Sequence, residues 1–253
     1  MNRLTRVQAA SGLGFAFFLA LHLATTVSAV GGPASYDGTL ASLRAVYRAH
    51  PIVELLLIGA TAATHITCAI LQIVRRRRTG PHPSPPLVLR IHRWAGYFLM
   101  LAIVGHVYAT RVMPAMAESG ADFSYLAFSI LAWPYFIKPY YYALGLAGAI
   151  HLGLGLGYAM TALGPRSPWI RKASAAGAGI AAALVVAGVT GMIARSAEAD
   201  RSRFDVYRAL YDRYMPVMPK PASSSKPLTS RREEPGPAPG RLLLPPRPSP
   251  GRS

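Results

Sequence analysis

The stretch AASGLGFAFFLALHLATTVSAV (residues 9–30) carries no charged residue and has one histidine, His22, near its middle. A helix needs about 20 mainly apolar residues to cross a bilayer, so this run is long enough to span one. Four further runs are similarly apolar, at residues 52–74, 94–113, 139–163 and 173–194. We therefore predict an all-α integral membrane protein, with a five-transmembrane-helix bundle over residues 1–195.

The composition agrees with a membrane protein. Hydrophobic residues make up 52% of the 253 residues, charged residues only 15%, and the mean hydropathy is +0.28, which is more apolar than a soluble domain of this size. The net charge of +17 lies mostly in short loops beside the apolar runs and in a Pro-rich tail. No nucleic-acid-binding motif accompanies it, so nucleic acid is excluded as a partner. Basic loops beside spans instead predict contact with membrane lipids.

The first apolar run has a second interpretation. Arg3 and Arg6, the run itself and Val27-Ser28-Ala29 imitate a cleavable signal peptide. The run is longer than the apolar core of such a peptide, about 7–15 residues. The histidine within it also favours a helix that is retained.

The distribution of basic residues predicts an orientation. Counting spans from the N-terminus, only Arg44, Arg48, Arg111 and Lys138 lie on the opposite side before the tail. The positive-inside rule then places the N-terminus on the cytoplasm-like side, and five spans place the tail on the other side. The basic residues on the N-terminal side are Arg3, Arg6, Arg75, Arg76, Arg77, Arg78, Arg90, Arg93, Arg166, Arg171 and Lys172.

The segments outside the spans give weaker patterns. We expect a short surface helix within residues 34–50 and a long loop at 114–138. Residues 196–215 predict an amphipathic helix, which lies either on the membrane surface or packed under the loops. From residue 216 to 253 the chain is rich in Pro, Arg and Ser and is expected to be disordered. The aromatic and apolar face of the amphipathic helix comprises Phe204, Tyr207, Leu210, Tyr211 and Tyr214.

The sequence excludes several kinds of chemistry. The single cysteine, Cys68, excludes an internal disulfide, and the absence of C-x-x-C-H excludes covalent c-type haem. There is no G-x-S-x-G, H-E-x-x-H or P-loop motif, so no hydrolytic catalytic residue is predicted. Electron transfer is the one enzymatic role that the sequence leaves open.

Four of the seven histidines fall one per span in the first four spans: His22, His65, His106 and His151. At 1.5 Å per residue, His22 and His106 lie ~12 and ~10 Å from one membrane face, and His65 and His151 lie ~14 and ~18 Å from the other. Polar groups at membrane depth usually have a function. Two imidazoles at each of two levels predict two haem b groups with bis-His ligation, haem iron being the only metal expected.

Other interpretations of these residues remain open. The histidines could form a structural cluster of interhelical hydrogen bonds, a site for a non-haem metal, or a proton path. Glycines beside the predicted ligands would admit a flat macrocycle or close helix packing. His92 and Arg93, at the edge of the third span, could bind an acidic headgroup or a quinone, or could simply anchor the span. The glycines in question are Gly105, Gly148, Gly153 and Gly155.

The histidine pattern and the five spans resemble the dihaem cytochrome b anchor of succinate dehydrogenases and fumarate reductases. That resemblance implies that His22 pairs with His106 and His65 with His151. It also implies a redox role, with electrons passing between quinol and flavoprotein and iron–sulfur partner subunits.

A second resemblance covers about residues 10–160. It rests on FFLALHLATT (17–26), YDGTLASLRAVYRAHPIVELLLIG (36–59), THITCAILQIVRRRR (64–78), HRWAGYFLMLAIVGHVYATRVMP (92–114), DFSYLAFSILAWP (122–134) and YYYALGLAGAIHLGLG (140–155). These stretches are similar to the fungal mitochondrial adaptor proteins of the outer membrane. The resemblance implies a five-helix transmembrane domain that acts in lipid homeostasis and recruits a bridge-like lipid-transfer protein to organelle contact sites.

The adaptor resemblance also implies that short Pro-x-Pro motifs contact the lipid-transfer protein. Candidates occur at residues 81–83, 219–221, 235–237 and 246–250. The sequence thus leaves three functional hypotheses: a dihaem adaptor, a dihaem redox subunit, and a haem-free scaffold whose histidines only pack helices.

Overall fold

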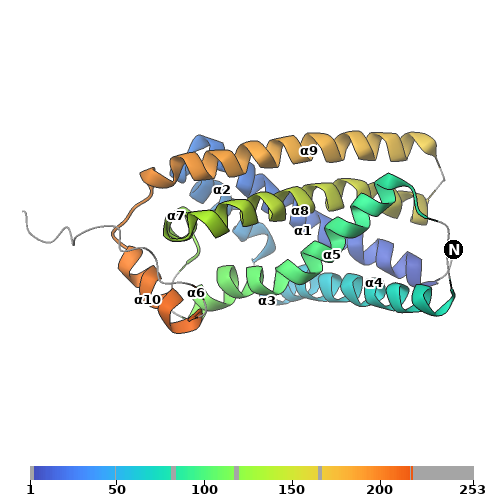
Figure 1. Cartoon of the computed structure of the whole chain (residues 1–253), viewed down its shortest axis with the longest axis horizontal. Helices are drawn as coiled ribbons and strands as arrows, with labels where there is room; N and C mark the ends of the chain where they lie inside the picture. The colour runs from blue at the N-terminus through green and yellow to red at the C-terminus, as the bar shows by residue number, and fades with distance from the viewer. Residues whose placement is uncertain are drawn as a thin grey trace, which may run out of the picture. The chain divides into compact units, whose positions relative to one another are not determined.

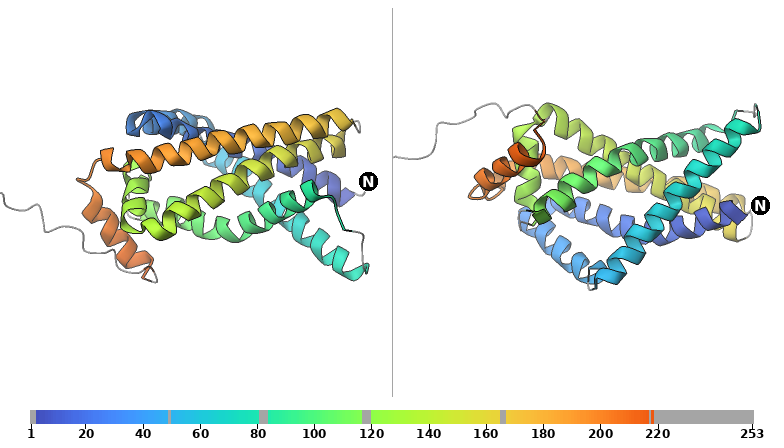
Figure 2. Two further views of the ribbon diagram at one scale, coloured as in Figure 1. Left: turned by 45° about the horizontal axis from the view of Figure 1, so that its top comes forward. Right: turned by 90° about the horizontal axis from the view of Figure 1, so that it is seen from below.

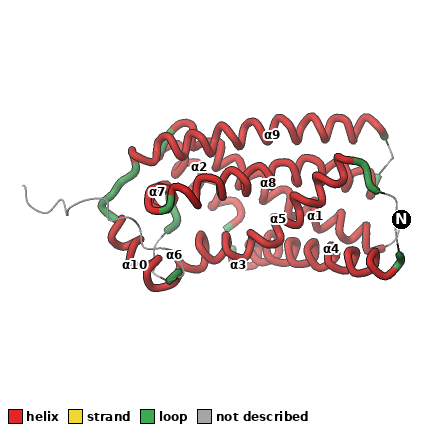
Figure 3. The backbone as a smooth tube through the Cα atoms, viewed as in Figure 1, coloured by secondary structure: helices red, strands yellow, loops and turns green. Residues whose placement is uncertain are grey.

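The computed structural model describes residues 3–48, 50–80, 84–116, 120–164, 167–216 and 218. The chain divides into two units, Met1–Lys220 and Pro221–Ser253, and every described residue lies in the first. All regular elements of the described residues are helices, with no strand among them (Figure 3). Apart from residues 216 and 218, the predicted disordered tail lies outside the described residues, as do all four Pro-x-Pro candidates.

Among the described residues, five continuous helices are long and apolar enough to cross a membrane, which agrees with the five predicted spans. Each begins or ends a few residues outside the predicted apolar run, because a helix satisfies its own backbone and continues into the polar headgroup region. The helices are α1 (Arg3–Ser28) with the turn Ala29–Gly31, α3 (Pro51–Glu54) with α4 (Thr61–Arg78), α5 (Leu87–Val107) with α6 (Met113–Met116), α8 (Pro134–Leu163), and α9 (Pro168–Ala194) with the turn Arg195–Glu198.

Two of the five spans contain a widened, π-helical segment. Leu55–Ala60 joins α3 to α4, and Tyr108–Val112 joins α5 to α6. The two segments are linked at their outer ends, where Arg111 Nε lies 3.2 Å from Glu54 Oε1. Such π-helical turns occur preferentially near functional sites.

The spans pack unequally (Figures 1 and 2). Helices α8 and α9 lie side by side along much of their length, α1 packs against α4, α8 and α9, and α5 packs against α8. Glycines permit the close approach of α8 to α9: a Cβ on Gly153 would lie 2.5 Å from the Cα of Ala178. Small residues at such contacts are typical of membrane helices.

The two ends of the bundle differ in chemistry. We call one end the arginine end; it is where α1, α5 and α9 begin and α4 and α8 end, on the side of the N-terminus in Figure 1. We call the other the cap end, because three shorter helices gather there: α2 (Pro33–Tyr47), α7 (Phe123–Ala132) and α10 (Phe204–Tyr214). The described basic residues of the arginine end are Arg3, Arg6, Arg75, Arg76, Arg77, Arg78, Arg90, Arg93, Arg171 and Lys172.

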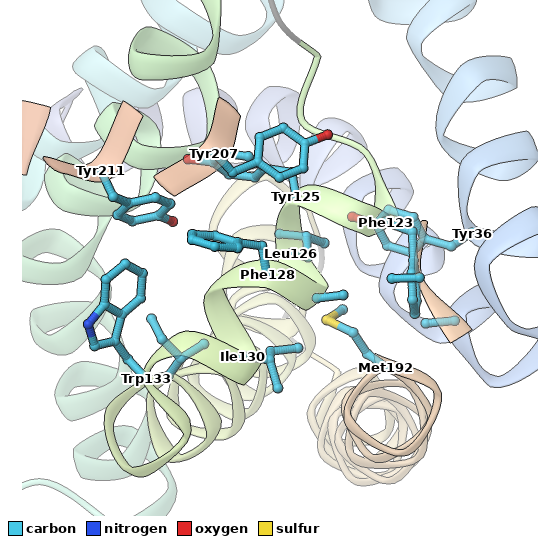
Figure 4. Close-up of a cluster of buried hydrophobic side chains, with 14 of the residues drawn as sticks. Tyr36, Phe123, Tyr125, Leu126, Phe128, Ile130, Trp133, Met192, Tyr207 and Tyr211 are labelled. Atoms are coloured by element: carbon cyan, nitrogen blue, oxygen red, sulfur yellow. The ribbon is translucent and has the colours of Figure 1, made fainter. Parts of the chain in front are cut away.

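Helix α7 forms the centre of the cap and corrects the expectation of a loop at 114–138. Eight consecutive residues, from Phe123 to Ile130, are buried. Asp122 is the N-cap, since its Oδ1 accepts a hydrogen bond from the Tyr125 backbone N–H at 2.8 Å. The helix is too short to span a membrane, and its short apolar sequence did not distinguish a helix from a loop. Its aromatic residues meet those of the neighbouring helices in one cluster (Figure 4).

Polar contacts fasten the cap to its neighbours. Asp122 Oδ2 accepts a hydrogen bond from Arg203 Nη1 at 2.7 Å, and its Oδ1 also accepts one from the Tyr207 hydroxyl at 3.2 Å. From α2, Asp37 Oδ1 accepts a hydrogen bond from the Phe123 backbone N–H at 2.8 Å, and Arg44 donates to the Ala121 carbonyl at 2.8 Å. Two carboxylates thus satisfy backbone donors at the start of α7.

Helix α10 packs against α7, which is the second of the two interpretations of the amphipathic segment. Tyr207, Leu210 and Tyr211 are buried, and the Tyr211 ring lies 4.7 Å from that of Trp133 between centroids. The aromatic face is therefore engaged by protein and not turned to lipid.

Candidate functional site

The histidines predicted at one membrane level, His22 and His106, meet between α1 and α5. Their ring centroids are 5.8 Å apart and the rings are inclined at 68°. Phe18, one turn earlier on α1, stacks on His22 with centroids 5.8 Å apart. The Nδ1 atom of His106 is buried and has no hydrogen-bond partner among the described residues.

The other predicted pair, His65 and His151, meets between α4 and α8. These centroids are 6.1 Å apart and the rings are inclined at 82°. His65 Nδ1 lies 3.0 Å from the Gln8 carbonyl oxygen, and His151 Nδ1 lies 3.1 Å from the His92 carbonyl oxygen. A carbonyl can only accept, so both Nδ1 atoms carry a proton, and in the neutral tautomer the Nε2 atoms are the ones that keep a lone pair.

Each histidine pair joins two helices that do not pack closely on one another. Within the described residues, α1 with α5 and α4 with α8 are absent from the closely packed helix pairs. In addition, α5 contributes no buried residue and α4 only Cys68. The paired imidazoles therefore approach across the interior of the bundle, from helices held in place by other neighbours.

The separation of the rings suits two ligands of one metal ion. A metal–imidazole bond is about 2 Å long and the ring centre lies about 1 Å beyond the nitrogen, so an ion held between two imidazoles sets their centroids about 6 Å apart. The two observed separations, 5.8 and 6.1 Å, agree with this value. Two neutral imidazoles are also the donor set of a bis-His haem.

Glycines lie against the histidine rings, but they are mostly not the expected ones. A Cβ on Gly12 would meet His65 Nδ1 at 2.8 Å, and a Cβ on Gly96 would meet His151 Cε1 at 2.8 Å. Of the glycines suggested by the sequence, Gly153 faces α9 and Gly105 has no neighbour within 4 Å. Being next to a histidine in sequence does not place a residue against its ring, since the helix turns by about 100° per residue.

His92 contacts the second histidine pair, His65 and His151, through the ring of His151. Its ring stacks on that of His151, with centroids 4.3 Å apart and planes at 6°, and Tyr158 lies beyond it at 5.3 Å. A Cβ on Gly155 would meet His92 Cε1 at 3.2 Å, so this one of the expected glycines does contact a histidine. His92 is thus a partly buried residue packed against α8, a placement that its position at the edge of a span did not indicate.

Other residues of the site were not evident in the sequence. Gln8 supplies the carbonyl for His65, and its side chain is hydrogen-bonded to Gln72. Two glutamines near the ends of apolar runs are the one signal that could have suggested this link. Among the described residues no group of three or more His, Cys, Asp or Glu could hold a metal ion.

Comparison of the chain with family models, with curated proteins and with solved structures finds no match. The functional argument therefore proceeds from the histidine geometry and from the membrane-spanning fold.

Proposed function

We propose that this chain is an integral membrane protein that holds two haem b groups, one between His22 and His106 and one between His65 and His151. The observation that carries the proposal is that two histidine pairs, at different levels of the bundle, each bring their rings to a separation compatible with one shared iron.

The protein's own contribution is to fix the ligands. The Gln8 and His92 carbonyls set the Nδ1–H tautomer of His65 and His151, as the outer contacts of metal-ligating histidines do. Phe18 limits the rotation of the His22 ring. When bound, haem b supplies one-electron redox chemistry.

The proposed cellular role is that of an adaptor in the mitochondrial outer membrane, acting in lipid homeostasis at organelle contacts. Its support is the resemblance of residues 10–160 to that family. The Pro-x-Pro motifs through which it would recruit a lipid-transfer protein lie outside the described residues. The rival role, a quinone-linked redox subunit, differs in requiring flavoprotein and iron–sulfur partners, so the partners that co-purify decide between the two.

The haem proposal is tested by a dithionite-reduced minus oxidised absorbance spectrum with a pyridine haemochrome assay on the purified full chain. We expect b-type haem at two per chain. His22→Leu or His106→Leu should remove one haem, and His65→Leu or His151→Leu the other. His50→Leu is the matched control, because His50 is exposed and outside the spans.

A folded protein, produced in haem-sufficient cells, that contains no haem would contradict the proposal. The four histidines would then be interhelical hydrogen-bonding residues. Loss of both haems in every variant, including His50→Leu, would mean that the substitutions report on folding and not on ligation.

A further inference from the structure

The arginine end has no acidic residue among its described residues. All four described ion pairs lie at the cap end, where the carboxylates are those of Glu54, Asp122 and Glu198. Among the described residues, the arginines and the lysine at the other end form no ion pair with a carboxylate. The phosphates of a bilayer are a source of counter-charge for basic residues at the end of a membrane-spanning helix.

A cavity of about 330 Å³ opens at this end between α5, α8 and α9. Two of its lining residues, Arg171 and Lys172, are cationic, and most of the remaining wall is apolar. The lining residues are Val88 of α5, Leu154, Gly157 and Tyr158 of α8, and Pro168, Arg171, Lys172, Ser174 and Ala175 of α9.

The Ser174 hydroxyl in the lining of this cavity is already hydrogen-bonded. The Ser174 hydroxyl accepts a hydrogen bond from the Gly157 N–H at 3.0 Å and donates to the Gly153 carbonyl. A Cβ on Gly157 would meet Ser174 Oγ at 2.4 Å, so the glycine brings α8 and α9 together here. A ligand entering the cavity therefore meets cations in the first turns of α9 and hydrocarbon beyond them.

The start of α9 adds to the positive potential. The N-cap Ser167 makes no side-chain hydrogen bond to the first turn, and that turn contains no acidic residue. Basic residues near a helix N-terminus oppose the helix dipole, an arrangement that a bound anion would relieve. Arg171 and Lys172 are exposed and lie within this region.

We infer that this cavity binds one anionic phospholipid, with its phosphate between Arg171 and Lys172 and its acyl chain along Val88, Leu154 and Ala175. The two cations favour a net negative headgroup over a zwitterionic one, whose own cation would meet like charge. The apolar wall favours a lipid over a soluble phosphate. The inference deepens the proposed lipid role by naming a lipid class and a site, and it is independent of haem.

The test is a titration of the detergent-solubilised full chain with phosphatidylglycerol, followed by native mass spectrometry. R171Q/K172Q should lower the affinity by about tenfold, because each cation near the membrane surface contributes appreciably to binding acidic lipid. R77Q/R78Q is the matched control, since it removes the same charge from the same end but from residues that do not line the cavity. Its affinity should change by less than about twofold.

A second pair of variants tests the cavity without changing charge. Ala175→Leu fills the wall and should displace the lipid, whereas Ala176→Leu makes the same change at a neighbouring residue that does not line the cavity. Equal loss in R77Q/R78Q would overturn the inference in favour of diffuse attraction. Equally tight binding of phosphatidylcholine, or displacement by inorganic phosphate at equal concentration, would also overturn it.

Haem content measured on the same samples separates the two proposals. Lipid binding that is lost in R171Q/K172Q while haem content is unchanged supports the inference. Wild-type protein that binds the lipid but contains no haem would contradict the haem proposal alone.

Discussion

The imidazoles of His65 and His151 each have two contacts that fix their position. A backbone carbonyl holds Nδ1, and a glycine on a neighbouring helix lies against the ring, Gly12 for His65 and Gly96 for His151. A heavy atom at 2.8 Å from a ring atom is closer than van der Waals contact permits. One methyl group on either glycine must therefore move the imidazole that it faces.

We accordingly expect Gly12→Ala or Gly96→Ala to alter the ligation of the haem proposed between His65 and His151. The expected result is loss of about half of the haem, or a changed α band, in the reduced spectrum of the purified protein. Gly105→Ala is the control, because nothing lies within 4 Å of its added Cβ. If all three variants gave the wild-type spectrum, close contact with the ring would be irrelevant to ligation.

A pH effect is expected at Asp37 in the cap. Burial raises the pKa of this carboxyl, and the nearby Asp122 adds to the increase, while the Phe123 N–H and Arg44 oppose it. The folded protein therefore takes up a proton at higher pH than the unfolded chain does, and this group contributes more stability as pH falls through its folded-state pKa. Wild type should gain thermal stability relative to Asp37→Asn as pH is lowered from neutral.

The measurement is the difference in unfolding midpoint between wild type and Asp37→Asn across that pH range. A difference that stays constant, or that shrinks as the pH falls, would show that Asp37 titrates normally.

At the scale of elements, the cap depends on the contact between α7 and α10. Tyr207 has no exposed surface, packs against Tyr125 with centroids 5.3 Å apart, and donates its hydroxyl to Asp122. Tyr207→Ala should destabilise the protein by about 3 kcal/mol, as loss of a buried aromatic side chain does. Tyr135→Ala removes the same side chain from a position that is 96% exposed and should have little effect in a thermal unfolding assay.

Equal destabilisation by both tyrosine variants would mean that the exposed ring of Tyr135 also contributes to stability, through contacts with lipid or detergent. In that case the α7–α10 contact would have no special part in stability.

The elements also show which features a sequence can predict. The five spans were predictable because a helix in lipid must satisfy its own backbone and carry a continuous apolar run. The levels of His22, His65, His106 and His151 followed from the fixed rise per residue. Helix α7 was not predicted, because a short apolar stretch fits a loop as well as a helix; in the structure Asp122 caps it and α10 packs against it. The stacking of His92 on His151 depends on helix rotation and crossing, which hydropathy does not determine.

For the whole molecule, the segregation of charge predicts an orientation. The arginine end should face the cytoplasm-like side, and the cap end should face the opposite side. In a Cys68→Ser background, Trp169→Cys should react with a membrane-impermeant maleimide from the first side and Val206→Cys from the second. Both positions are suitable because their side chains are 73% and 50% exposed. Labelling of both from the same side would contradict the predicted number of crossings.

The described chain ends at Met218, which packs against the aromatic cluster of the cap. A force applied to the chain beyond Met218 therefore reaches α10 before it reaches a membrane-spanning helix. Tension would be carried first by the rings of Tyr207 and Tyr211 and by the link between Arg203 and Asp122. The cap contacts are therefore the first interactions that would resist a force applied to the chain beyond Met218.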